Sequence, residues 1–164
     1  MDWSFKTYDE LKLNELYHLL ELRSQVFIVE QNCVYQDIDG KDLSAIHLLG
    51  YLKNKLVAYS RILRPGAIGT KHVKIGRVVT HKKNRGNGVG YTLVKKSIDF
   101  CRDHFGNKII KISAQVHLKN FYTKCGFTES GKTYLEDGIP HCAMYYDSDQ
   151  KIDLTDLQNR MKGL

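Results

Sequence analysis

The sequence has little of what disulfide-rich, metal-binding and membrane proteins depend on. It contains no apolar run of the roughly 18 residues that a bilayer-spanning helix needs, and residues 1–6 lack the apolar stretch of a signal peptide. We therefore expect a cytoplasmic protein that does not associate with membranes. The cysteines form no CxxC pair, so we expect no metal site and reduced, structural thiols at Cys33, Cys101, Cys125 and Cys142.

Composition predicts a folded chain whose charge is distributed unevenly. Only two of the 164 residues are proline and 42% are hydrophobic, which allows a buried core and excludes a largely disordered chain. Residues 71–111 hold eleven bases and two acids, a balance of +9, whereas residues 1–50 hold nine acids and four bases, a balance of −5. A solvated surface explains such a pattern as well as a polyanion bound by the middle of the chain and a cation by its first third.

The hydrophobic pattern predicts strands and helices in an α/β (α+β) arrangement, with a mixed sheet covered on both faces. We expect strands over 3–8, 47–52, 56–63, 73–80 and 109–115, and two more after residue 127, the last around 143–146. Helices are expected over 15–29, capped by Asn14, and over 90–104 and 118–124, with a polar loop over 30–42. Residues 1–147 form the expected domain, and the tail, 148–164, is expected to hold a short surface helix from residue 152.

A basic, glycine-rich turn joins the expected strand 73–80 to the next helix. In VVTHKKNRGNGVG (78–90), glycines let backbone N–H groups approach a ligand, the helix adds its positive dipole end, and Arg85 adds a charge. Such a turn can bind a pyrophosphate. It differs from the P-loop and from the dinucleotide fingerprint in its spacing, and a plain tight turn explains the glycines equally well.

Two motifs in this order resemble the GNAT acetyltransferases. RGNGVG (85–90) resembles the R-x-x-G-x-G/A signature, and NFYTKCGF (120–127) resembles the second signature, a short helix carrying a tyrosine before Gly-Phe. Further segments resemble the ElaA-type branch of that superfamily: VEQNC (29–33), YQDIDG (35–40), IGRV (75–78) and EDGIPH (136–141). The resemblance covers residues 1 to about 147 and implies the GNAT fold, a central mixed and mostly antiparallel twisted sheet flanked by helices on both faces.

The resemblance also implies a cosubstrate, acetyl-coenzyme A (acetyl-CoA), and assigns residues to it. The splayed backbone at Val78, Val79 and Thr80 would hold the pantetheine arm, and Lys82, Lys83 and Arg85 would meet phosphates. Tyr122 matches the general acid that protonates the thiolate, although a core aromatic is the alternative. The implied cofactor-binding residues are Val78, Val79, Thr80, Arg85, Gly86, Asn87, Gly88, Val89, Gly90, Asn120 and Tyr122.

The group that deprotonates an amine acceptor is less sharply defined. Glu30 in the 30–42 loop is the first choice, with an ion-paired or capping acid as an equal alternative. The other candidates are Asp37 and Asp39 in the same loop, and His117 and His141 at strand ends; a hydrogen-bonded core histidine is the alternative for His141. Arg23 is expected to pair with a loop acid such as Asp39. The expected substrate-binding residues are Glu30, Gln31, Asp37 and Asp39.

These inferences favour an N-acetyltransferase that moves an acetyl group directly from acetyl-CoA to a primary amine. The acidic first third suggests a cationic small molecule or a lysine-like amine as the acceptor. The alternative is a catalytically silent module that binds or senses an acyl-CoA. A nucleic-acid binder is disfavoured, because the basic segment lacks the interleaved aromatics of a stacking platform. Oligomeric state and acyl chain length are left open, with a homodimer as one option.

Overall fold

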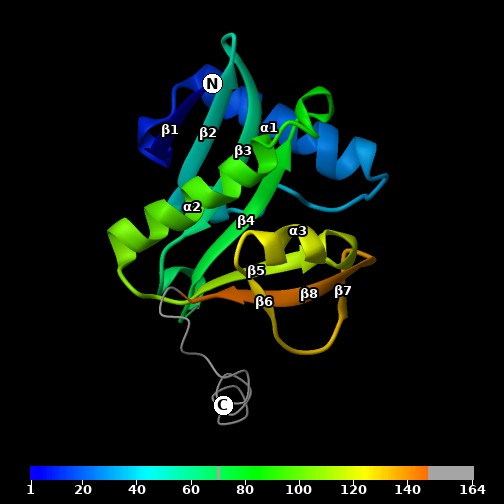
Figure 1. The fold of residues 1–164 in the computed structure, drawn as a ribbon. Coiled ribbons are helices and arrows are strands. Elements are labelled where there is room, and N and C mark those ends of the chain that lie inside the picture. Colours follow the sequence, from blue (N-terminus) through cyan, green and yellow to red (C-terminus); the bar gives the residue numbers. More distant parts are fainter. Residues whose placement is uncertain (70, 148–164) are drawn as a thin grey trace.

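The computed structural model describes residues 1–69 and 71–147, so the expected tail helix lies outside the described residues. One eight-stranded sheet has the order β1-β2-β3-β4-β5-β8-β6, with β7 paired to β8 (Figure 1). Neighbouring strands run antiparallel except β4 and β5, which are parallel, and this confirms the mixed, mostly antiparallel sheet. The strands are β1 (Asp2–Thr7), β2 (Ile46–Leu52), β3 (Lys55–Leu63), β4 (Val73–Thr80), β5 (Ile110–Gln115), β6 (Thr128–Glu129), β7 (Tyr134–Glu136) and β8 (Ile139–Tyr146).

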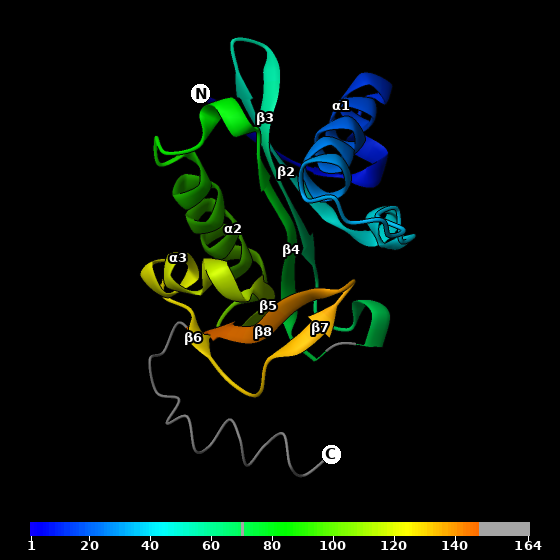
Figure 2. The ribbon, with the colours of Figure 1, turned by 90° about the vertical axis from the view of Figure 1, so that its right-hand side faces the viewer.

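Helices cover both faces of the sheet, as expected (Figure 2). Helix α1 (Leu13–Arg23) lies on one face, and α2 (Val89–Phe105) and α3 (Lys119–Lys124) lie on the other. An apolar cluster joins α2 to β4, β5 and β8, and a second cluster joins α1 to β2, β3 and β4. Within the described residues, none of these helices has the length and apolarity required to span a bilayer.

Helix α1 begins two residues earlier than the sequence predicted, and Asn14 is not its cap. Lys12 holds the N-cap position and Leu13 is the first helical residue. The Glu15 carboxylate accepts a hydrogen bond from the Lys12 backbone N at 2.8 Å and another from Lys6 Nζ at 2.7 Å. An acid in the first turn thus binds the backbone N–H of the N-cap residue, as the glutamate of a capping box does.

The first helix does not continue as a regular α-helix to residue 29. Ser24–Glu30 forms a π-helical turn, η2, whose hydrogen bonds span five residues, for example from the C-cap Gln31 N to Val26 O at 3.2 Å. A π-turn is wider than an α-turn, and such turns are frequent at functional sites. Phe27 and Glu30 of η2, and Gln31 directly after it, line the cleft described below.

Strands β4 and β5 pair only at their beginnings. Their register pairs are Val73 with Ile110 and Lys74 with Lys111, after which the strands diverge. On its other side β4 stays paired with β3, but its register shifts at a bulge where Arg77 has a φ of 51°. Within the described residues, Val78–Thr80 therefore has a strand partner on one side only, as the splayed-strand expectation requires.

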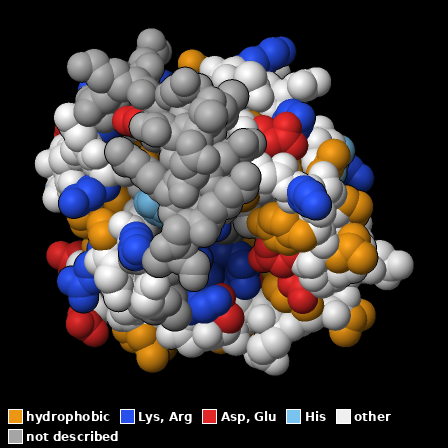
Figure 3. Space-filling view, turned by 90° about the horizontal axis from the view of Figure 1, so that it is seen from below, with side chains coloured by type: hydrophobic (Ala, Val, Ile, Leu, Met, Phe, Trp, Pro, Cys, Tyr) orange, Lys and Arg blue, Asp and Glu red, His pale blue; other side chains and the backbone are white. Residues whose placement is uncertain are grey.

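Charged side chains of both signs meet at the end of the molecule where β4 begins. Figure 3 shows this end from below, with Lys and Arg side chains gathered beside Asp and Glu side chains near the centre. Two ion pairs, Arg77 with Asp37 and Arg85 with Glu30, join the basic middle segment to the acidic first third, so the charge separation along the sequence is not a separation in space. Acidic and basic segments are brought together here, and the pairs they form decide which charges can bind a ligand.

Candidate active site

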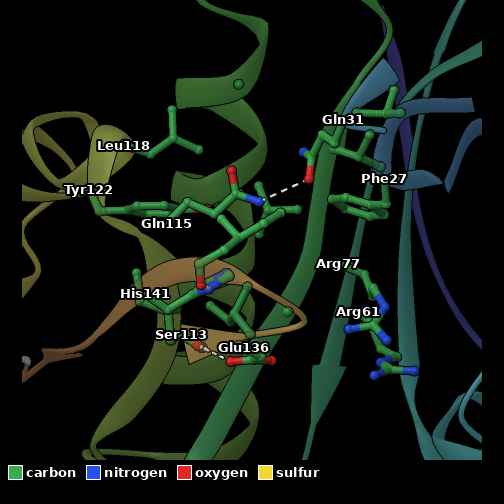
Figure 4. A pocket seen from close by; sticks show the side chains of 18 of the residues that line it. Phe27, Gln31, Arg61, Arg77, Ser113, Gln115, Leu118, Tyr122, Glu136 and His141 are labelled. Atoms are coloured by element: carbon green, nitrogen blue, oxygen red, sulfur yellow. Dashed lines mark hydrogen bonds between the residues drawn. The ribbon is translucent and has the colours of Figure 1, made fainter. Parts of the chain in front are cut away.

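A cleft of about 1150 Å³ lies where β4 and β5 diverge. One wall is formed by η2 and β4, and the other by β5, α3 and the β7–β8 hairpin (Figure 4). The side chains of Gln31 and Gln115 face each other across it, and Gln115 Nε2 donates a hydrogen bond to Gln31 Oε1 at 3.0 Å. The cleft is therefore open to a ligand but bridged by this one amide contact.

Most of the residues singled out from the sequence line this cleft, but several do not. The three catalytic candidates and most of the implied cofactor contacts belong to the lining: Glu30, Tyr122, His141, Val78, Val79, Thr80, Arg85, Gly86, Gly88 and Gly90. So do Gln31, Asp39 and His117. The remaining candidates lie outside the lining: Asn87, Val89, Asn120, Asp37, Lys82 and Lys83.

The glycine-rich turn leads into a helix end that suits an anion. Gly88 is the N-cap of the 17-residue helix α2, with a φ of 76°, and no side chain caps this end. Gly86 has a φ of 83°, and a Cβ at either glycine would meet nothing within 4 Å. The backbone at these two glycines is thus open to a ligand beside the positive end of the helix dipole, which fits a pyrophosphate.

Arg85 joins this turn to β4 and to η2. Its guanidinium donates to the Thr80 carbonyl from Nε and from Nη2, each at 3.1 Å. The same group forms a bidentate ion pair with the Glu30 carboxylate, with an Nη2–Oε2 distance of 3.1 Å. The hydrogen bond from Arg85 lowers the pKa of Glu30, which makes this carboxylate a weaker base than a free glutamate.

Tyr122 reaches the cleft from α3, with a side chain that is almost fully buried. Its ring packs edge-on against Phe121 and Phe127, at centroid distances of 5.0 and 6.0 Å. Burial raises the pKa of Tyr122, so the phenol keeps its proton at neutral pH. Among the described residues, no hydrogen bond involves the hydroxyl, which leaves its proton available to a group in the cleft.

His141 has a defined tautomer and a free ring nitrogen. Its Nδ1 lies 2.8 Å from the Ile139 carbonyl oxygen, which can only accept, so Nδ1 carries the hydrogen of the neutral ring. The ring stacks on Tyr134 at a centroid distance of 6.3 Å. Within the described part of the chain, Nε2 has no hydrogen-bond partner and can accept a proton.

The acids of the 30–42 loop do not face the cleft as free carboxylates. Arg23 pairs with acids of this loop, as expected, but they are Asp37 and Asp42 and not Asp39: it donates to Asp37 Oδ2 and to Asp42 Oδ1, each at 2.8 Å. Arg61 binds Asp39 at 2.6 and 2.8 Å and Asp42 at 3.0 Å. Arg77 donates to Asp37 Oδ1 at 2.7 Å. The three arginines are therefore ion-paired with the three aspartates.

This Arg–Asp network changes the interpretation of the acidic loop. Burial alone would raise the pKa of Asp39, but hydrogen bonds and charge from Arg61, helped by Arg77, hold it well below its usual value. Asp39 thus stays ionised and bound to arginine. The loop acids stabilise the loop against β3 and β4. The cationic acceptor therefore stays a prediction, and Asp37 and Asp39 no longer support it.

The sequence analysis missed the polar face of β5. Lys111, Ser113 and Gln115 alternate with buried apolar residues, and all three line the cleft. Ser113 Oγ lies 2.5 Å from Glu136 Oε2 and 2.6 Å from the Tyr134 hydroxyl, both on β7. The signal was the period-two alternation over 110–115, which distinguishes a strand with one polar face from a strand buried on both faces.

Both the sequence and the fold match a known family over most of the chain. Residues 9–148 match a family model described as an acetyltransferase (GNAT) domain. The chain is 44% identical over 146 residues to Protein ElaA of Escherichia coli K12, spanning 88% of this chain and 95% of that protein. The chain belongs to the GNAT acetyltransferase family.

Two crystal structures extend the match with this GNAT protein to three dimensions. An acyl-CoA N-acyltransferase from Pseudomonas aeruginosa is 39% identical with a TM-score of 0.84, covering 89% of this chain and 99% of that chain. Escherichia coli ElaA is 43% identical with the same TM-score of 0.84, covering 90% and 100%. The expected GNAT fold and ElaA-type branch are confirmed, and the chain is an acyltransferase whose donor is an acyl-CoA.

Proposed function

We propose that this GNAT protein transfers an acetyl group from acetyl-CoA directly to a primary amine. The observation that supports this most strongly is the cleft between β4 and β5, because one strand there offers unpaired backbone and Tyr122 faces the same space. One end of the cleft has the glycine-rich turn, and the other has the polar side chains of β5 and β7. A donor and an acceptor can therefore enter from different ends and meet.

The donor is expected to bind along β4 and the start of α2. On the side where β4 has no strand partner, the backbone of Val78–Thr80 would hold the amide-containing arm, much as an added strand binds a sheet edge, and Arg85 already occupies the Thr80 carbonyl there. Gly86, Gly88 and the first turn of α2 would hold the pyrophosphate, together with Arg85. Asn87, Val89 and Asn120 lie outside the lining, so their proposed part is to shape these segments, through the backbone of the turn and of α3.

The reaction needs one proton accepted and one donated. The amine nitrogen forms a bond to the acyl carbon as the carbon–sulfur bond breaks. We assign His141 Nε2 to the amine proton, because Glu30 is held by Arg85 in an ion pair that lowers its pKa. We assign Tyr122 to the proton that neutralises the departing thiolate, since its phenol is protonated and without a partner among the described residues. Atoms and charge then balance without a covalent acyl-enzyme.

Substitution of Tyr122 tests this proposal against the silent binding module. Tyr122→Phe removes only the hydroxyl, so kcat for release of coenzyme A should fall by about 10²- to 10⁴-fold with little change in acetyl-CoA affinity. His141→Gln should lower kcat comparably, whereas His117→Gln is the control from the same cleft and should leave kcat unchanged. A wild-type protein that binds acetyl-CoA but acetylates no amine in a broad panel would identify a binding module.

A further inference from the structure

Two lysines face each other at the closed end of the cleft. Lys74 on β4 and Lys111 on β5 are direct register partners in the short parallel pairing, and both line the cleft. Their neighbours Val73, Ile75 and Ile110 belong to the apolar cluster under α2, on the opposite face of the sheet. The two ammonium groups therefore project from the centre of an eight-stranded sheet into the same space.

This arrangement is unfavourable for the protein without a ligand. Like charges directly opposite one another on neighbouring strands destabilise a sheet. Burial lowers the pKa of Lys74, and the charges of Lys111 and Lys41 lower it further. Lys41 is bound to Asp39 at 3.3 Å, whereas no described carboxylate lies within 4.0 Å of the ammonium group of Lys74 or Lys111. Lys111 instead places its ammonium over the Tyr145 ring, 5.6 Å from the centroid.

The nearby acids of the described residues form no ion pair with either lysine. The aspartates of the loop are matched by Arg23, Arg61 and Arg77, as described above. Glu136 also lines the cleft and its charge acts on Lys74, raising the pKa of that lysine, but this is the weakest of the influences on Lys74, and the carboxylate binds Ser113 instead of forming an ion pair with the lysine. Among the described residues, the lysine pair thus has no ion-pair partner, in a cleft large enough for a second substrate.

We propose that Lys74 and Lys111 bind a carboxylate on the acceptor, so that the acceptor is an amine that also carries an acid group. This rests on the proposed function and specifies its substrate class. The subsite belongs to the acceptor and not to acetyl-CoA, because it lies on the opposite side of the cleft lining from the glycine-rich turn, at the end where β4 begins. The acceptor differs from the purely cationic amine that the acidic sequence segment suggested.

The register of β5 also sets the length of this acceptor. Lys111 pairs with Tyr145 and Gln115 pairs with His141, so the lysine pair and the proposed base lie four residues apart along the strand. Four residues of a strand span about 13 Å, and the flexible lysine side chains shorten the gap. The acceptor therefore needs several bonds between its amine and its carboxylate, as in an ω-amino acid or at the side-chain amine of a free diamino acid.

A matched series of amines tests the subsite. The wild-type protein should acetylate 6-aminohexanoate with a kcat/KM at least about 10-fold above that of hexylamine or 1,6-diaminohexane, which share its chain but lack the carboxylate. Lys74→Met and Lys111→Met keep side-chain length and remove charge, so each should cost about 10-fold in kcat/KM for 6-aminohexanoate and leave hexylamine unchanged. Lys124→Met, elsewhere in the cleft lining, is the matched control and should change neither.

The results separate this proposal from the proposed function. Equal use of hexylamine and 6-aminohexanoate by the wild type, or equal losses for both in the lysine variants, would overturn the carboxylate subsite and leave acetyl transfer intact. A rise in the dissociation constant of acetyl-CoA in the lysine variants would assign the pair to the donor and also overturn it. Calorimetry of 6-aminohexanoate and hexylamine with the protein measures the subsite without turnover, so tighter binding of the acid supports it even if no amine is acetylated.

Discussion

The Glu30 carboxylate and the Arg85 guanidinium join the two sides of the cleft entrance, from η2 to the turn before α2. The same guanidinium is a proposed contact of the acetyl-CoA pyrophosphate, so a phosphate and Glu30 compete for it. Glu30→Gln should therefore lower the dissociation constant of acetyl-CoA by about two- to five-fold, the range that an exposed ion pair supplies. Isothermal calorimetry at low salt measures this change.

A second ion pair provides the control for Glu30. Glu129→Gln breaks the exposed pair with Lys119, which lies outside the cleft lining, and should leave acetyl-CoA affinity unchanged.

Glu30 was also the first choice for the base. If Glu30→Gln lowered kcat by 10²-fold or more and abolished the acidic limb of the rate–pH profile, the base would be Glu30 and the assignment to His141 would be wrong.

The glycine turn provides a test of the pyrophosphate site that preserves the fold. Valine at Gly88 would be strained whatever the available space, because a β-branched residue resists a φ of 76°. Asparagine tolerates this region, so Gly88→Asn should fold and weaken acetyl-CoA binding by about 10-fold by placing a side chain at the helix end. Gly40→Asn is the control, because Gly40 has nearly the same backbone conformation as Gly88, with a φ of 75°, but lies outside the cleft lining. Unchanged affinity in Gly88→Asn, or an equal loss in Gly40→Asn, would contradict the placement.

The Arg–Asp network predicts how stability depends on pH. The pKa of Asp39 is lower in the folded protein than in the unfolded chain, so its contribution is fully present above the unfolded pKa, about 4, and is lost on further acidification. Asp39→Asn should therefore be less stable at pH 7 and lose less stability between pH 5 and about pH 3. Urea midpoints at several pH values measure both slopes. Asp99→Asn, on the exposed side of α2, should retain the wild-type profile.

The fold was largely predictable because its signals are local. The expected bounds of β4 are those observed, and α2 differs from its expected range by one residue at each end. Short spacing rules govern both, since β-branched residues fill the strand and glycines precede and follow the helix. The prediction was less accurate for the C-terminal region. Three strands follow residue 127 instead of the expected two, and the last, β8, begins at Ile139 and not near residue 143.

The chemistry of the site was predictable only where a motif carried it. The Gly-rich turn and Tyr122 are contiguous in sequence with their supporting elements, so the family resemblance indicated them. The partners of the loop acids were not predictable, because Arg61 and Arg77 come from strands that no local sequence pattern connects to Asp37 and Asp39. The facing of Lys74 and Lys111 likewise depends on a register between strands separated by a whole helix.

The two register pairs of β4 with β5 join the two halves of the sheet. On the α2 side, Val94 and Ile98 pack against residues of both halves and hold them together, while the opposite side is the polar cleft. Apolar packing on one face therefore joins the two halves of the sheet, and the gap between the diverging strands on the other face is left for a ligand.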